Sequence, residues 1–206
     1  LERVVRIAEF LAVKSLADKD IVLAGALLHD TALPSGNDYN YEKNKKIVKD
    51  LLKNLKLSTV ELEAIAECVA SHEGTTTPKT MEAKIVHDAD VLEKTGLLGI
   101  IRHTWKLTNL GVIDYKEITN EDVKTVLDHV KWRQKQLQTS TAKKIGKYLS
   151  TVMTKNKAKL IISFSAELAF KGVITEKIAV ALKKHLSVEE NNKLKEQLSL
   201  SYLEWF

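Results

Sequence analysis

The sequence predicts an all-α fold. Only two of the 206 residues are prolines and eight are glycines, whereas good helix formers such as Leu, Ala, Lys and Glu are abundant. Near the N-terminus, apolar residues recur at helical spacing, among them Val4, Ile7 and Leu11. A chain of this length is expected to form one domain, or one domain with an appended subdomain.

Caps and turn residues divide the chain into helices. Ser58 and Glu61 form a capping box, and Gly172 ends a helix that Thr141 opens. A turn-rich loop with Pro34 is expected at residues 31–40, and another loop at 73–79. Helices are predicted from residue 1 to about 12, from a cap at Asp18 or Asp20 to residue 30, over 41–55 and over 58–72. Another is predicted over 80–110, with Gly96 and Gly99 as kink or close-packing points, and the next begins at a cap at Asn120. The last three are predicted over 141–170, 175–186 and 187–203.

The formal net charge of +5 favours anionic partners. Its lysines are spread along the chain without a dense basic block, so the charge fits small phosphorylated substrates and argues against nucleic acid. Cys68 is the only cysteine, which excludes an intrachain disulfide and a cysteine-based zinc site and favours the cytoplasm. Without an 18-residue apolar run, no membrane span is expected. The end of the chain, 202–206, is expected to form a homodimer contact.

Two polar groups in apolar surroundings indicate a metal site. His29 and Asp30 follow the eight residues 21–28, which carry no polar side chain, and His87, Asp88 and Asp90 lie in a second apolar segment. A buried charge needs an ion pair, a hydrogen-bond network or a metal. Imidazole nitrogen with carboxylate oxygen suits Mn, Fe, Co, Ni or Zn better than Mg.

Simpler interpretations of the same residues stay open at this point. His29 and Asp30 form a hydrogen-bonded pair at a helix end in one of them, and Asp90 accepts an ion pair from a lysine. His72 falls at a helix C-terminus, where a cationic side chain is favourable. His87, one turn before Asp90, is a ligand, a hydrogen-bond partner of a ligand, or a surface residue.

The order of these motifs resembles a known family. The His29-Asp30 pair, His72 in Ala-Ser-His-Glu-Gly, and Asp90 in His-Asp-Ala-Asp-Val-Leu are similar to the successive motifs of the HD-domain superfamily of metal-dependent phosphohydrolases, particularly its small stand-alone members. The resemblance continues through residues 88–102 and 139–145 and covers about residues 1–170.

The resemblance implies an HD-domain helical bundle at 1–171, with a C-terminal helical extension at 172–206 packed on the same domain. It implies hydrolysis of a phosphate ester or phosphoanhydride in a nucleotide or related small phosphorylated metabolite, with one or two divalent ions. Asp30, Asp88 and His72 are the expected catalytic groups. The expected metal ligands are His29, Asp30, His72 and Asp90, and the expected substrate contacts are Lys84, Lys94 and Arg102.

The sequence departs from the family pattern at several positions. Val91 replaces the usual arginine, Glu93 replaces the usual aspartate, and residues 40–45 lack the histidine common in two-metal members. The family's first histidine ligand would directly precede Leu1. These departures support an alternative function, a non-catalytic HD domain that senses a nucleotide or binds a partner. An ion-paired helix surface is the alternative for Arg102.

Overall fold

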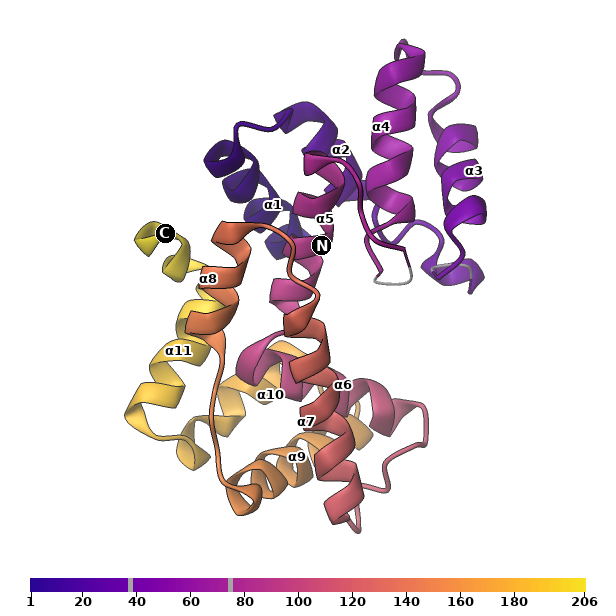
Figure 1. The fold of residues 1–206 in the computed structure, drawn as a ribbon. Helices are drawn as coiled ribbons and strands as arrows, with labels where there is room; N and C mark the ends of the chain where they lie inside the picture. The colour runs from indigo at the N-terminus through magenta and orange to yellow at the C-terminus, as the bar shows by residue number, and fades with distance from the viewer. Residues whose placement is uncertain (37–38, 74–75) are drawn as a thin grey trace. The chain divides into compact units, whose positions relative to one another are not determined.

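The computed structural model describes residues 1–36, 39–73 and 76–206, so positions 37–38 and 74–75 of the two predicted loops lie outside the described residues. The described residues form eleven α-helices and three short 3-10 segments, with no strand among them (Figure 1). The all-α prediction is therefore confirmed. None of the helices in these three ranges has the length and apolar character needed to cross a membrane.

The helices follow one another with short connections. Their bounds are α1 Glu2–Ser15, α2 Lys19–Leu28, α3 Tyr41–Leu52, α4 Thr59–Ala70, α5 Met81–Glu93, α6 Gly96–Asn109, α7 Asn120–Lys135, α8 Ser140–Leu149, α9 Lys155–Phe170, α10 Thr175–Ala181 and α11 Val188–Ser199. The 3-10 segments are Leu33–Ser35, Leu182–His185 and Ser201–Trp205. The predicted capping box of Ser58 and Glu61 is present at the start of α4.

Two compact units make up the chain, and the first contains most of the predicted site. It comprises Leu1–Leu92 and Gln136–Lys144. Within it, α2 packs against α1 and α4, and α4 also lies beside α3 (Figure 1). Apolar side chains from several of its helices, such as Ile7 and Ile85, are fully buried and form its core.

The helices α2 and α4 approach very closely at Gly25. A Cβ atom built on Gly25 would lie 2.5 Å from the Cβ of Cys68 and 3.2 Å from Val86. Only a residue without a side chain therefore allows this spacing. Burial raises the pKa of the Cys68 thiol, so this cysteine acts as a small apolar packing residue.

The second unit comprises Glu93–Lys135 and Ile145–Phe206. Its central helix is α6, which contacts α7, α9, α10 and α11. Residues 172–206 belong to this unit, while the predicted domain boundary at 172 stays a prediction. In the segment 202–206, Tyr202 is buried and Trp205 is exposed. The homodimer contact expected through this segment also stays a prediction.

The prediction of one helix over 80–110 is wrong, because α5 and α6 are separate helices, but the break falls at Gly96, one of the two expected kink or close-packing points. Gly96 opens α6 with a φ of +63°, which L side chains rarely adopt. A Cβ atom there would also lie 2.4 Å from the carbonyl oxygen of Leu149. Gly96 therefore marks a break with a close backbone approach.

The predicted helix 141–170 is likewise two helices, α8 and α9. Thr154 caps α9 by accepting a hydrogen bond from the backbone N–H of Lys157. The cap of α7 lies one residue before the expected Asn120, since the Thr119 hydroxyl accepts from the backbone N–H of Asp122. β-branched and capping residues at 150–154 explain the break that periodicity alone did not reveal.

The close approach at Gly96 has a measurable consequence. We expect Gly96→Ala to lower the free energy of unfolding by about 3 kcal/mol, because the new methyl group meets a backbone oxygen in a left-handed conformation. Gly111 is a matched control, with a φ of +70° and open space around its Cα. Gly111→Ala is expected to cost only about 1 kcal/mol. Equal losses in urea denaturation would contradict the steric explanation.

Candidate metal centre

His29 and His72 follow the C-terminal ends of α2 and α4, and both imidazoles are buried. The Nδ1 of His29 lies 2.8 Å from the carbonyl oxygen of Ala26, and that of His72 lies 2.7 Å from the carbonyl oxygen of Val69. Because a carbonyl only accepts, Nδ1 is the donor in each ring. In the neutral imidazole this leaves Nε2 as the atom with a lone pair, the form that binds a metal.

The Nε2 atoms of the two histidines face carboxylates. The Nε2 of His29 lies 3.2 Å from Asp30 Oδ2 and 3.9 Å from Asp90 Oδ1. The Nε2 of His72 lies 3.9 Å from Asp30 Oδ1, and the two imidazole centroids are 5.3 Å apart. The four residues predicted as ligands therefore meet in one place, although their metal-binding role stays a prediction.

A fifth residue, Glu73, belongs to the same group. Ligand atoms of His72, Glu73 and Asp90 all lie within 4.8 Å of one another, and all three side chains are buried. Sequence reasoning missed Glu73 because it was assigned to the start of a loop. Its position directly after His72 was the only signal, and adjacent residues reach one centre only where a helix has ended.

The expectation that Asp30 is buried with His29 is wrong, because 52% of the Asp30 side chain is exposed. The helix α2 ends at Leu28, so Asp30 lies beyond its apolar face. The hydrogen bond with His29 lowers the pKa of Asp30 despite partial burial. Burial lowers the pKa of His29, but the hydrogen bond to Asp30 and the charges of Asp90 and Asp30 outweigh it, so that the pKa is raised.

Asp88 is fully buried and makes three strong hydrogen bonds. Its carboxylate accepts from the backbone N–H of Gln138 and from the backbone N–H and hydroxyl of Thr139, each at 2.7 Å. Burial raises its pKa more than these bonds lower it. The predicted role of Asp88 as a catalytic base stays a prediction, whereas its contacts favour anchoring the start of α8 to α5.

His87 supports a neighbouring histidine. Its Nδ1 lies 2.7 Å from the backbone carbonyl oxygen of His72, and its Nε2 lies 3.2 Å from that of Gln136. Of the roles left open for His87, this geometry favours that of a hydrogen-bond partner. It holds the backbone that carries His72.

The predicted substrate contacts divide between the two units. Lys84 lies on α5, in the unit that contains the predicted ligands, while Lys94 and Arg102 belong to the second unit. The Nη1 of Arg102 donates to Glu93 Oε2 at 2.7 Å, which is the ion-paired arrangement considered as an alternative. Phosphate binding by these three residues stays a prediction.

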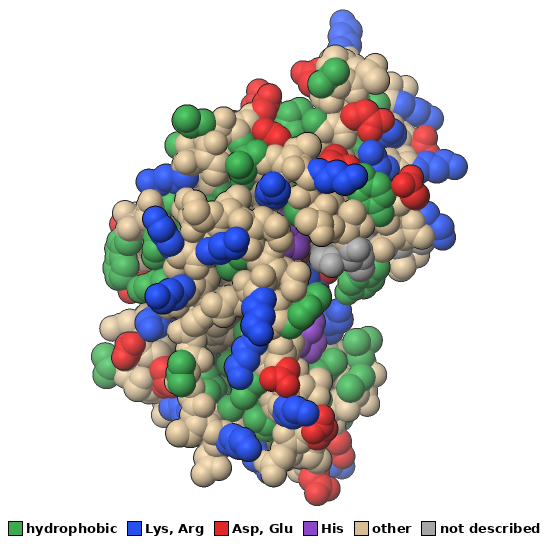
Figure 2. Space-filling model, in the orientation of Figure 1, with side chains coloured by type: hydrophobic (Ala, Val, Ile, Leu, Met, Phe, Trp, Pro, Cys, Tyr) green, Lys and Arg blue, Asp and Glu red, His purple; other side chains and the backbone are tan. Residues whose placement is uncertain are grey.

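Surface charge is mixed on the visible face. Lys and Arg side chains occur singly or in small groups, with Asp and Glu among them (Figure 2). Several lysines are paired, such as Lys45 with Glu63 at 3.1 Å. Such a surface differs from the continuous basic stripe expected of a nucleic-acid binder.

Comparison with known proteins identifies the first part of the chain. The family model described as HD domain matches residues 1–95, so this part of the chain is an HD domain and the predicted superfamily membership is confirmed. Most members of that family are metal-dependent hydrolases. The similarity expected beyond residue 95 stays a prediction. No curated protein matches the chain.

Proposed function

We propose that this chain is a metal-dependent phosphohydrolase that cleaves a phosphate ester or phosphoanhydride of a nucleotide or related small phosphorylated metabolite. The observation that carries the proposal is the convergence of His29, Asp30, His72 and Asp90. The Nδ1 atoms of the two histidines are already held by backbone carbonyls. The HD domain over residues 1–95 supports the same class of reaction.

The donor set fits a divalent ion. Imidazole nitrogen and carboxylate oxygen atoms are gathered within 4.8 Å of one another among buried residues, and such mixed sets suit Mn, Fe, Co, Ni or Zn. His72, Asp90 and Glu73 would hold the ion, with His29 and Asp30 beside them. When bound, the ion lowers the pKa of a coordinated water and neutralises charge on the phosphoryl oxygens.

The protein's own residues would orient the reaction. The backbone bonds at Nδ1 fix both imidazoles, so that little reorganisation is needed when substrate binds. The half-exposed Asp30 carboxylate would accept a proton from the attacking water. Lys84, in the same unit, would contact the phosphate.

A second candidate function is a nucleotide sensor without turnover. The observation that favours it is Val91, a fully buried apolar side chain at the position where the HD-domain pattern has an arginine. A sensor would need the metal and the nucleotide but no general base. Binding without hydrolysis separates it from the enzyme.

The test removes and restores the metal. We would treat the full natural chain with a chelator, and then assay phosphate and nucleotide products from a panel of nucleotides and phosphoesters with Mn, Fe, Co, Ni, Zn or Mg. We expect turnover to fall at least about 100-fold on chelation and to return with a transition metal. Bound metal without turnover would favour the sensor. Failure to bind any of these metals would overturn the proposed site.

A further inference from the structure

The helices α3 and α4 form a hairpin, and its tip, residues 51–60, exposes large apolar side chains. Leu51, Leu55 and Val60 are 55%, 59% and 78% exposed. Leu51 lies in the last turn of α3 and Val60 in the first turn of α4, so all three residues are at the same end of the hairpin (Figure 1). Single exposed apolar residues are ordinary, whereas a group of them at one place indicates an interaction surface.

The apolar surface of α3 is wider than the part that α4 covers. The buried residues of α3 recur every four positions and face α4; they are Asn44, Val48 and Leu52. Leu51 is about 100° away from Leu52 around the helix, which places it beyond this contact. The backbone N–H of Leu55 donates to the carbonyl oxygen of Leu52 at 2.9 Å, so a tight turn keeps Leu55 beside the end of α3.

The charge of the hairpin tip is positive. Lys53 and Lys56 are exposed, and neither forms an ion pair within the part of the chain that the structure describes. Residues 51–60 include no aspartate or glutamate. The next carboxylates on α4 already have partners, since Glu61 belongs to the capping box and Glu63 pairs with Lys45 at 3.1 Å. The two lysines of the tip are therefore available to an anionic partner.

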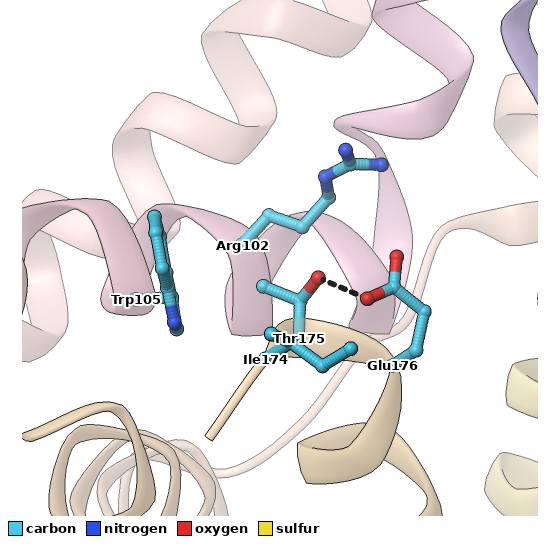
Figure 3. Close-up of a pocket in the computed structure, with 5 residues that line it drawn as sticks. All are labelled: Arg102, Trp105, Ile174, Thr175 and Glu176. Carbon is cyan, nitrogen blue, oxygen red and sulfur yellow. Dashed lines mark hydrogen bonds between the residues drawn. The ribbon is translucent and has the colours of Figure 1, made fainter. Parts of the chain in front are cut away.

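Unpaired charge distinguishes the hairpin tip from a pocket in the second unit. That pocket is lined by Arg102, Trp105, Ile174, Thr175 and Glu176 (Figure 3). There, Arg102 donates to the buried Glu93 at 2.7 Å, and the Thr175 hydroxyl donates to Glu176 at 3.1 Å. Because these charged groups are engaged within the chain, the pocket does not define a class of ligand.

Apolar residues together with free lysines restrict the kind of partner. In a symmetric contact with a second copy of the chain, the same lysines would face and repel one another. Proteins that hold single-stranded nucleic acid stack its bases on aromatic side chains, and residues 51–60 contain none. The surface of an anionic bilayer fits both features, because leucine enters the acyl boundary while lysine keeps its ammonium group among the headgroups.

We propose that the hairpin tip docks this chain on an anionic lipid surface. Leu51, Leu55 and Val60 enter the boundary between headgroups and acyl chains, and Lys53 and Lys56 pair with lipid phosphates. Docking of this kind occupies one face of a bilayer, so it needs no spanning helix.

The docking surface is separate from the candidate metal centre. The helix α4 has 12 residues, and the tip and His72 lie at its opposite ends. At 1.5 Å per residue, this separates them by about 18 Å. The proposal therefore does not depend on the metal site or on the proposed hydrolysis.

The test measures binding of the full chain to lipid vesicles by co-sedimentation. The probes are vesicles of phosphatidylcholine alone and vesicles in which about a third of the lipid is phosphatidylglycerol. We expect at least about tenfold stronger binding to the anionic vesicles, and weaker binding when salt rises from about 0.1 M to about 0.5 M. Equal binding to both kinds of vesicle, or none up to about 5 mM lipid, would overturn the proposal.

Charge variants test the part played by the lysines. Lys53→Gln/Lys56→Gln is expected to weaken binding to the anionic vesicles at least about tenfold. The matched control is Lys143→Gln/Lys144→Gln, which removes two exposed lysines of α8 and so lowers the net charge equally. Asp50, the exposed carboxylate just before the tip, repels anionic lipid, so Asp50→Asn should strengthen binding about two- to fivefold. Equal losses in the two lysine pairs would show that net charge alone acts, and would contradict the assignment to the tip.

Apolar variants separate a lipid surface from an acidic protein. Leu51→Ser/Leu55→Ser is expected to weaken vesicle binding at least about tenfold. The control Leu110→Ser/Val112→Ser changes two residues that are 65% and 61% exposed between α6 and α7, and should leave binding unchanged. Circular dichroism shows that each variant is folded. Full vesicle binding by the Leu51→Ser/Leu55→Ser protein, or binding to soluble polyglutamate as strong as to the anionic vesicles, would overturn the proposal and indicate an acidic protein partner.

Discussion

Asp90→Asn is expected to lower metal content and metal-dependent phosphohydrolase turnover each by at least about 100-fold. Asp90 contributes a buried carboxylate close to His72 and Glu73, and its Oδ1 lies 3.9 Å from the Nε2 of His29. The amide has nearly the same shape as the carboxylate but carries no charge, so it binds a divalent ion far more weakly. Metal per chain is measured by mass spectrometry, and turnover with the best substrate of the panel.

The control for Asp90 is an aspartate away from the centre. Asp50, on α3, is exposed, and Asp50→Asn should leave metal content and turnover unchanged. Circular dichroism and thermal unfolding show whether each variant is folded. A folded Asp90→Asn protein with full metal content and full turnover would show that the metal centre is elsewhere.

Asp88→Ala is expected to lower the free energy of unfolding by about 3–5 kcal/mol, although Asp88 is only two residues from Asp90. The substitution leaves the backbone donors of Gln138 and Thr139 and the Thr139 hydroxyl without their shared acceptor in a buried place. The cost of burying the carboxylate, which is visible in its raised pKa, reduces the net loss. Unfolding in denaturant measures the change in the free energy of unfolding.

Two further variants separate anchoring from catalysis at this position. Thr139→Val removes one of the three donors and is expected to cost about 1 kcal/mol. The loss of stability in Asp88→Asn should lie between the losses in Thr139→Val and Asp88→Ala. The amide keeps one acceptor oxygen but places its own N–H donor against another donor. An Asp88→Ala protein of unchanged stability that has lost turnover would instead support the catalytic role predicted for Asp88.

The sequence predicted the elements whose signals are local. The capping box at Ser58 and the end of α9 at Gly172 depend on neighbouring residues, and both are present. The separation of α5 from α6 depends on the approach of the Gly96 backbone to Leu149, a residue far along the chain. Periodicity cannot report such a contact, so Gly96 was recognised as a kink or close-packing point but not as the end of one helix and the start of another.

The candidate site shows the same limit. His29, Asp30, His72 and Asp90 were found from their types and order, and the structure brings them together. Glu73 was missed because its burial arises only from tertiary packing. The exposure of Asp30 could not be read from its apolar neighbours, since the helix that carries them ends before it.

The contact between Gly25 and Cys68 has a consequence for the metal centre. His29 comes four residues after Gly25 on the α2 side, and His72 comes four residues after Cys68 on the α4 side. This close contact between the two helices is thus about one helical turn from both imidazoles. Because no Cβ atom fits between Gly25 and the Cys68 side chain, this contact fixes the spacing of α2 and α4 near both histidines. The spacing between His29 and His72, two of the residues predicted to bind a metal, therefore depends on a glycine that is not itself among the predicted ligands.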